Sequence, residues 1–485
     1  MFDYRTVAMR KLAALAPKYL PFADVATEQV PLSQLLRLSL FQITVGMALV
    51  LLVGTLNRVM IVELSVPATL VALMLALPLL FAPLRTLIGF KSDVHVSALG
   101  LRRVPYIWKG TLLQFGGFAI MPFALLVLSG YGEAVDAPRW IGYSSAALSF
   151  LLVGAGVHMV QTVGLALATD LVAEEDQPKV VGLMYVMLLL GMVISALVFG
   201  TLLENYTPGR LIQVIQGAAV VTVSLNMCAM WKQEARSRVR AAEMKAATPV
   251  QFSEAWASLM QARGMARLLV VIALGTFGFG MADVLLEPYG GQALGLSVAN
   301  TTKLTALLAT GTLIGFVIAS RGLGQGGSPD RFAMLGAGIG VPGFIAIIAS
   351  SLSGGIAMFL AGTLATGLGA GLFGHATLTA TLRAAPKNRI GLALGAWGAV
   401  QATAAGLGVA LAGIVRDLIV GAQAPGGTSV QMPYNTVFMI EAVFLALAIL
   451  VLLPALKYPR SKTDRPELCV PADHTSASSN PVEVP

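Results

Sequence analysis

Long apolar segments recur throughout this chain, and they constrain its fold more strongly than any other feature. A helix of about 20 apolar residues spans the hydrocarbon core of a bilayer. Only 12% of the residues are charged, compared with about 25% in a soluble domain, so a bilayer suits this chain better than water. We therefore predict an all-α membrane protein with about twelve transmembrane helices, near residues 39–60, 66–86, 107–129, 141–168, 180–203, 211–231, 267–289, 303–321, 332–352, 355–382, 390–420 and 434–456.

A long polar segment divides the predicted helices into two sets of six. The sequence thus predicts five parts: an N-terminal arm (1–38), a six-helix bundle (39–231), a central loop (232–266), a second six-helix bundle (267–456) and a tail (457–485). The tail ends in DHTSASSNPVEVP, a composition typical of disordered segments.

The positive charges fall mostly on one side of this scheme. The arm, the even-numbered loops and the tail hold 27 of the 32 lysines and arginines, and the odd-numbered loops hold the other 5. The positive-inside rule therefore predicts that both termini and the central loop are cytoplasmic. We interpret the net charge of +8 as this membrane signal, and we predict no nucleic-acid partner.

The two halves contain similar strings. GMALVLLVG begins at Gly46 and GMADVLLEP begins at Gly280, and six of their first seven letters agree. A looser pair is EEDQPKVVGLM, from Glu174, and RAAPKNRIGLA, from Arg383. Both pairs fall at equivalent places in the two halves, which favours an internally duplicated structure.

Duplicated six-helix halves with a long central loop resemble the major facilitator architecture. The loop after the second predicted helix, GFKSDVHVSALGLRR, is similar to that superfamily's G-x-x-x-D…G-x-R-[RK] loop, with extra residues inserted. The matching positions are Gly89, Asp93, Gly100, Arg102 and Arg103. The resemblance implies a conformational loop, in which a carboxylate meets basic side chains and a helix end at the cytoplasmic mouth. The insertion leaves the partner of Asp93 open, and the alternative is an ordinary positively charged loop.

Four longer strings carry a closer resemblance. They are LPFADVATEQVPLSQLLRLSLFQ, GTLNRVMIVEL, LRRVPYIWKGTLLQFGGFAIMPFALL and FGMADVLLEPYGG, which occur in this order. Together they resemble the PucC/LhaA family of purple phototrophic bacteria, the bacteriochlorophyll delivery branch of the major facilitators. The resemblance runs from about Leu20 to Leu456.

This resemblance implies a function in assembling light-harvesting antenna complexes in the bacterial inner membrane. The implied partners are the antenna alpha and beta polypeptides, bacteriochlorophyll bound transiently rather than covalently, membrane lipid and, as a further option, pigment-synthesis enzymes. The resemblance leaves open whether the core or the peripheral antenna is served.

Ionisable or strongly polar groups at membrane depth are costly, so they are candidates for function. We select Asn57, Arg58, His158, Asp283, Glu287, Tyr289 and His375 as pigment or cavity candidates. They fall on the first, fourth, seventh and tenth predicted helices, which line the central cavity in the major facilitators. Pro288 should end or bend the seventh helix, and Tyr289 is predicted at the membrane interface, as an anchor, a gate or a docking face.

Asp283 belongs to one half only, because the repeat aligns it with Leu49. We predict that Asp283 pairs with Arg58 across the halves, since an arginine partner would keep a buried carboxylate ionised. Such a pair would act as a gate, would orient a substrate, or would simply join the two helices; the sequence leaves these open.

His158 and His375 are possible axial ligands to the magnesium of bacteriochlorophyll, because neutral imidazole suits that position. The alternative for each is an ordinary packed, hydrogen-bonded histidine in a glycine-rich helix. No other metal site is predicted.

Three functions are compatible with these features. The first is an assembly factor that brings bacteriochlorophyll to antenna polypeptides; the second is a facilitator transporting a small amphipathic solute; the third is a chaperone of antenna helices that holds no pigment. An enzyme is not expected, because we find no nucleotide-binding loop, zinc motif or nucleophile–base arrangement in the sequence.

Overall fold

The structure is a computed structural model of the 485-residue chain. It describes residues 30–80, 88, 92, 101, 103–130, 134, 136–173, 176–234, 257, 259–261, 264–353, 355–384, 390–422 and 429–457. The arm up to residue 29, most of the central loop, the tail, and the predicted loop residues Gly89, Asp93, Gly100 and Arg102 lie outside the described residues.

The described residues before 235, which we call the N-half, form six helical elements. The first runs through α2 (Leu32–Leu38), α3 (Leu40–Leu49) and two π-helical stretches, η2 (Val50–Leu56) and η3 (Val59–Glu63). The others are α4 (Ala68–Leu80), α6 (Val104–Ser129), α7 (Arg139–Asp170), α8 (Gln177–Leu202) and α9 (Pro208–Met230).

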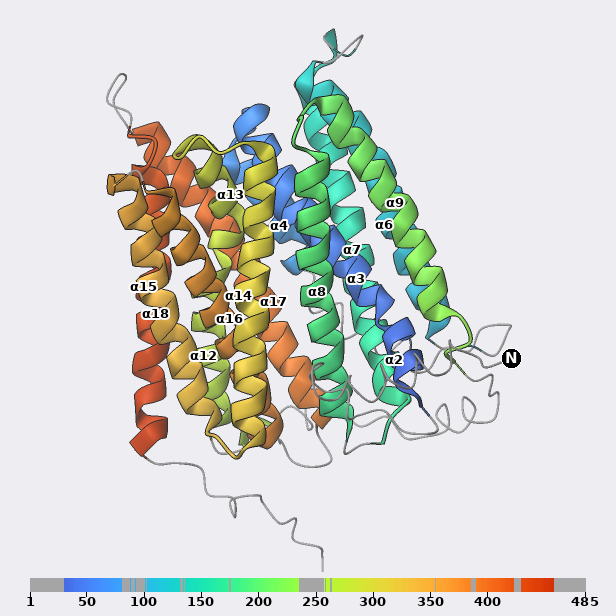
Figure 1. Ribbon diagram of the computed structural model, residues 1–485, viewed down its shortest axis with the longest axis vertical. Coiled ribbons are helices and arrows are strands. Elements are labelled where there is room, and N and C mark those ends of the chain that lie inside the picture. Colours follow the sequence, from blue (N-terminus) through green and yellow to red (C-terminus); the bar gives the residue numbers. More distant parts are fainter. Residues whose placement is uncertain are drawn as a thin grey trace, which may run out of the picture.

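The described residues from 264 onwards, which we call the C-half, form a second set of six. Its first element is split into α12 (Met265–Gly280) and α13 (Ala282–Gln292). The remaining helices are α14 (Val298–Gly324), α15 (Pro329–Ser353), α16 (Ile356–Ala384), α17 (Ile390–Ala422) and α18 (Met432–Lys457). The two halves lie side by side, with the N-half in blue to green and the C-half in yellow to red (Figure 1).

The predicted all-α membrane class is confirmed. Eleven segments in the described part of the chain are long and apolar enough to cross a membrane, and α4 is a shorter apolar helix. The start of the first helix differs most from the prediction: it begins at Leu32, although the sequence predicted an arm up to residue 38. This segment contains polar residues, but it also has an apolar face that packs in the bundle, where Leu35 and Leu38 are fully buried.

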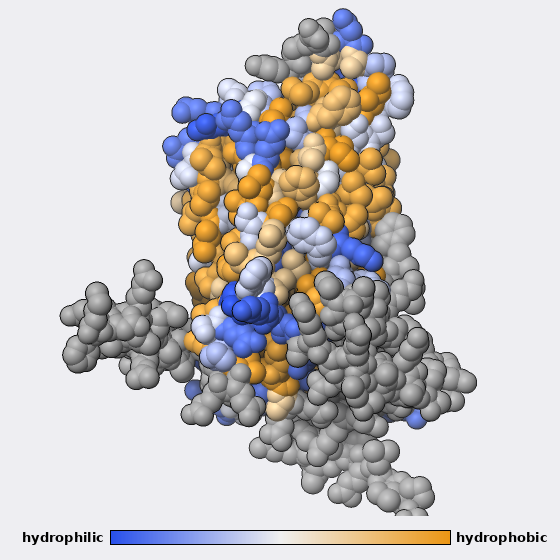
Figure 2. Space-filling model, turned by 90° about the vertical axis from the view of Figure 1, so that its right-hand side faces the viewer, coloured by the Kyte–Doolittle hydropathy of each residue, from blue (hydrophilic) through white to orange (hydrophobic). Residues whose placement is uncertain are grey.

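The alternating course of the helices gives the bundle two ends. We call the end where α2 begins and α18 ends the termini side, and the opposite end the distal side (Figure 1). Hydrophobic side chains cover the broad middle of the face formed by α6 and α9, as Figure 2 shows. Leu112, Phe115 and Val220 are among these exposed apolar residues, as expected for a surface that contacts lipid.

Glycines bring α14 and α16 into backbone contact within the C-half. A Cβ atom added at Gly367 would lie 2.3 Å from the carbonyl oxygen of Leu308, and one at Gly371 would lie 2.0 Å from that of Thr312. Small residues at these positions therefore allow the close approach that stabilises helix pairs in lipid.

Candidate functional site at the contact between the halves

The first helix of the N-half crosses over to the C-half on the distal side. Asn57 is fully buried, and its Nδ2 donates a hydrogen bond of 2.7 Å to the carbonyl oxygen of Val284 in α13. Two residues earlier in the chain, the hydroxyl of Thr55 lies 3.2 Å from the hydroxyl of Thr302. Two polar side chains of η2 and its neighbouring turn thus bind directly to the seventh and eighth helices.

Arg58 is part of the same contact, but it does not pair with Asp283. Its guanidinium forms an ion pair with Glu63, and its Nη2 donates to the carbonyl oxygen of Leu296 at 3.1 Å. The predicted Arg58–Asp283 pair is therefore wrong. Arg58 lies beside Gly291, and eight residues of helix separate Gly291 from Asp283, which is about 12 Å along the axis.

A tyrosine from the α8–α9 connection lies beside this ion pair. Burial raises the pKa of Tyr206 to about 12; the nearby Glu63 carboxylate raises it further, and Arg58 opposes the shift. The Arg58–Glu63 pair therefore lies near Tyr206 of the N-half and the Leu296 backbone of the C-half, while Glu63 itself is exposed.

Glu287 is buried, with 3% of its surface exposed, and it accepts a hydrogen bond from the hydroxyl of Thr305. It faces Gly54 of η2, where an added Cβ would lie 2.5 Å from the Glu287 Oε1. The glycine therefore provides the space that this intramembrane carboxyl group occupies between the halves.

Asp283 has a different environment from Glu287. All residues from Met281 to Gly290 are buried except Asp283, which is exposed. Asp283 lies one helical turn before Glu287, on the same face of α13. The structure thus places one carboxylate inside the contact between the halves and the other next to it, open to the surroundings.

The helix that carries these acids is interrupted, and a residue that we did not select from the sequence supports the interruption. Glu441 of α18 is fully buried, and its Oε1 accepts a hydrogen bond from the backbone N–H of Ala282, at the start of α13. The break follows Gly280, and Pro288, where we predicted the end or bend, lies inside α13. Glu441 lies within the apolar run VFMIEAVF. Selecting ionisable groups at membrane depth, as we did for the other candidates, could therefore have found it.

Tyr289 lies in the core of the C-half and not at the membrane interface. It is fully buried, and its ring packs against those of Phe359, Tyr434 and Phe438 at centroid distances of 5.4–5.6 Å. The prediction of an interfacial anchor is therefore wrong, because α15, α16 and α18 surround this position. The contacts assign Tyr289 a packing role.

The two candidate histidines differ in accessibility. His375 of α16 is 8% exposed, and its ring lies 4.2 Å from the ring of Phe316. His158 of α7 is only partly buried. The described residues contain no group of three or more histidine, cysteine or acidic side chains able to hold a metal ion together.

A second link between the halves involves α17. The carboxylate of Asp417 accepts a hydrogen bond of 2.7 Å from the backbone N–H of Thr69 in α4. Its neighbour Arg416 donates to Gln292 at 3.0 Å and lies over the ring of Tyr434. These groups lie near the distal end of α17.

On the termini side, the halves meet through apolar side chains. Tyr185 of α8 lies edge-on to Trp397 of α17, with ring centroids 6.4 Å apart. The indole N–H of Trp397 donates to Thr377 of α16 at 3.4 Å. No pattern in the sequence indicated this contact, because aromatic residues are common in apolar helices.

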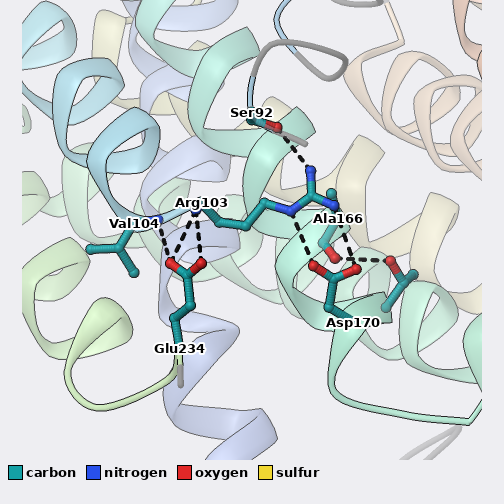
Figure 3. Close-up of polar contacts among 7 residues, drawn as sticks. Ser92, Arg103, Val104, Ala166, Asp170 and Glu234 are labelled. Carbon is teal, nitrogen blue, oxygen red and sulfur yellow. Dashed lines mark hydrogen bonds and ion pairs between the residues drawn. The ribbon is translucent and has the colours of Figure 1, made fainter. Parts of the chain in front are cut away.

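Of the five loop positions that match the facilitator motif, Arg103 is the one that lies among the described residues. Its Nε donates to Asp170, at the end of α7, at 3.1 Å, and its Nη1 donates to Ser92 at 2.8 Å. The Glu234 carboxylate accepts the backbone N–H groups of Arg103 and Val104 at the start of α6. Figure 3 shows the side chain extended between Ser92 and Asp170, with Glu234 below the backbone.

This arrangement has the components that the facilitator resemblance implied: a carboxylate, a basic side chain and a helix end. All of them belong to the N-half, and Asp170 and Glu234 were missed because they are distant in sequence from the loop. A carboxylate at a helix N-terminus satisfies backbone N–H groups that otherwise lack a partner. Arg103 therefore ties the ends of α6 and α7 to Ser92.

Comparison with known proteins identifies the family. A family model described as "PUCC protein" matches residues 55–458. Protein PucC of Rhodobacter capsulatus is 73% identical over 456 residues, which cover 94% of this chain and 99% of that protein. The chain belongs to the PucC family. The resemblance inferred from the sequence is thereby confirmed.

Two more distant relatives of this PucC-family chain are informative. The "Bacteriochlorophyll synthase 44.5 kDa chain" of Rhodobacter capsulatus is 28% identical, covering 87% of this chain and 94% of that protein. A bacterial homolog of the human lysosomal transporter Spinster, solved in an inward-facing and unoccupied conformation, has a TM-score of 0.63 at 15% identity, covering 88% of this chain and 96% of that chain. This structural likeness confirms the major facilitator fold.

The Glu441 contact leads to a stability prediction for this PucC-family chain. We expect Glu441→Leu to lower the free energy of unfolding by about 1–3 kcal/mol, because the N–H of Ala282 loses its acceptor in a dry interior. Glu441→Gln keeps an acceptor oxygen and should cost less. Thermal unfolding of the purified protein in mild detergent measures both.

Met439→Leu is the matched control, because Met439 lies on the same helix with 51% of its surface exposed. We expect it to behave like the unchanged protein. Equal melting temperatures for Glu441→Leu and Met439→Leu would contradict a supporting role for Glu441 at the helix break.

Proposed function

We propose that this chain is an assembly factor for bacterial light-harvesting antenna complexes. It binds antenna alpha and beta polypeptides and delivers bacteriochlorophyll to them, and it is not an enzyme. The observation that carries the proposal is membership of the PucC family over residues 55–458. A relative named for bacteriochlorophyll synthase, aligned over 87% of this chain, supports a pigment as the cargo.

The geometry favours a hydrophobic cargo over a small charged solute. Glu287 is engaged by Thr305 within the contact between the halves, and Glu441 is engaged by the backbone of α13. These two acids therefore hold helices in place instead of facing a substrate. Large apolar side chains are exposed on both halves, among them Phe123 and Ile194 in the N-half and Leu418 in the C-half. These surfaces suit contact with single-span antenna helices in lipid.

The termini side is proposed to face the cytoplasm of the bacterial inner membrane, where the excess of lysine and arginine places it. In this orientation the hydrogen-bonded contact of Asn57 and Arg58 lies toward the periplasm. The aromatic contact of Tyr185 with Trp397 lies toward the cytoplasm. Pigment would then be exchanged on the cytoplasmic side, where the described contact between the halves is an apolar one that separates at lower cost.

Within this proposal, His158 is the better of the two candidate ligands for the pigment magnesium. An axial ligand needs room for a flat macrocycle in front of its ring nitrogen. His375 is enclosed and lies against Phe316 at 4.2 Å, whereas His158 is partly exposed on α7. His375 then serves in packing α16 against α14.

Transport of a small amphipathic solute is the second candidate, and one observation favours it. Asp283 is exposed within the membrane-crossing part of the chain, directly after an interrupted helix. Interrupted helices form the substrate and ion sites of many transporters with internal repeats. Flux of a solute in proteoliposomes that disappears in Asp283→Asn would support this candidate.

Deleting the gene tests the main proposal. We expect near-infrared antenna absorbance to fall while bacteriochlorophyll is still synthesised, because antenna polypeptides would lack the factor that assembles them. Absorption spectra of whole membranes and of solvent extracts measure the two quantities separately. Complementation with the intact gene is the control, and normal antenna absorbance in the deletion strain would defeat the proposal.

The spectrum of the gently purified protein tests pigment binding itself. We expect bacteriochlorophyll bands in the unchanged protein, a several-fold loss in His158→Phe, and retention in the matched His375→Phe. Equal pigment content in the two variants would refute the ligand role of His158. An unchanged protein free of pigment would instead support a chaperone that binds antenna helices alone.

A further inference from the structure

An apolar groove runs along the C-half between α17 and α18, with α12 as its floor. Its volume is about 390 Å³, and it is lined mainly by Leu274, Phe277, Ala399, Thr403, Leu407 and Phe444. Leu407 is 50% exposed, so the groove opens on the outer surface within the membrane-crossing part of the bundle.

The fold itself does not require this groove. The C-half consists of two three-helix repeats, as in other facilitators, so α16 with α14 occupies the place equivalent to α12 with α17. There, Gly371 of α16 lies against the backbone of α14, with only 2.0 Å from an added Cβ to the Thr312 oxygen. Gly408 of α17 is less tightly packed, because its added Cβ would have its nearest neighbour, Met281, at 3.4 Å. The helices α14 and α16 are thus in backbone contact, whereas the equivalent pair, α12 and α17, is packed less closely.

The size of the groove limits what can occupy it. Ala399 and Leu407 are eight residues apart, which is about 12 Å along the axis of α17. An apolar groove of this length and volume suits one hydrocarbon chain.

A positive charge lies on the same face of α12, toward the termini side. Arg267 and Leu274 are seven residues apart, two helical turns, with Val270 between them on that face. Val270 is 49% exposed, so the face is open from Arg267 to the groove. Within the described part of the chain, Arg267 has no ion-pair partner among the acidic side chains. A cation about 10 Å from the start of an apolar groove complements a lipid with an anionic headgroup.

We propose that this groove is a binding site for an anionic membrane lipid, with one hydrocarbon chain between α17 and α18 and its headgroup at Arg267. The bound chain fills the groove between α17 and α18, above α12, and so stabilises the C-half. The proposal does not depend on antenna assembly, and a neutral esterified pigment lacks the charge that Arg267 would recognise.

Lipid binding to the full-length protein tests the site. The protein is purified in mild detergent, stripped of lipid, and titrated with phosphatidylglycerol or with phosphatidylcholine of the same chains. Native mass spectrometry measures bound lipid, and thermal unfolding measures stabilisation. We expect phosphatidylglycerol to bind more tightly, Arg267→Gln to weaken it about fivefold, and Ala399→Phe to remove binding by filling the groove.

Two variants serve as matched controls. Arg321→Gln removes an exposed arginine from the termini-side end of α14, and Ser224→Phe fills a second groove of about 280 Å³, between α6 and α9. Both should bind phosphatidylglycerol like the unchanged protein. Thr403→Leu narrows the groove with a smaller side chain, and it replaces Ala399→Phe should that variant fail to fold.

Three results would overturn the proposal. They are equal phosphatidylglycerol binding by the unchanged protein, Arg267→Gln and the groove-filling variant; equal binding of phosphatidylcholine and phosphatidylglycerol by the unchanged protein; and occupation of the groove by bacteriochlorophyll in place of the lipid, independent of Arg267. Each is measured on bound ligand, so the outcome is separate from that of the antenna experiments.

Discussion

The hydrogen bond from Asn57 to the backbone oxygen of Val284 joins the first and seventh helices inside the bundle. In a membrane, no water competes for such groups, so a polar side chain at this depth must find its partner within the protein. The contact fixes the rotation of both helices, and this rotation places Arg58 beside Leu296 and Glu287 opposite Gly54. The distal contact between the halves depends on this placement.

The seventh helix differs in backbone structure from the first helix, its counterpart in the other half, because the seventh helix is interrupted. The repeat aligns Leu49 with Asp283, but only the second copy begins a new helix at this point, with Glu441 accepting the N–H of Ala282. The first copy instead widens into π-helical turns from Val50 onwards. π-helical turns and interrupted helices both occur frequently at functional sites of helical proteins. The two halves are therefore similar in the order of their helices but differ in the polar groups that they carry.

Hydropathy and charge were enough to predict the membrane class and the two sets of helices, because both depend on composition over long segments. Pairing between side chains was harder to predict. Arg58 joins Glu63 instead of Asp283 because pairing depends on depth along two helices, which the sequence does not specify. Glu441 was visible as an acid in an apolar run. The Tyr185–Trp397 contact depends on how the two halves pack and had no sequence signal.

The central structural claim is that the first helix and the eighth helix touch on the distal side. Thr55→Cys with Thr302→Cys tests it, in a chain whose own Cys228 and Cys469 are replaced by Ser and whose central loop carries a protease site. The account predicts that oxidation in native membranes links the halves, so that they migrate together after cleavage until a reductant is added. Halves that separate after oxidation and cleavage, just as they do in the Thr55→Cys single variant, would contradict it.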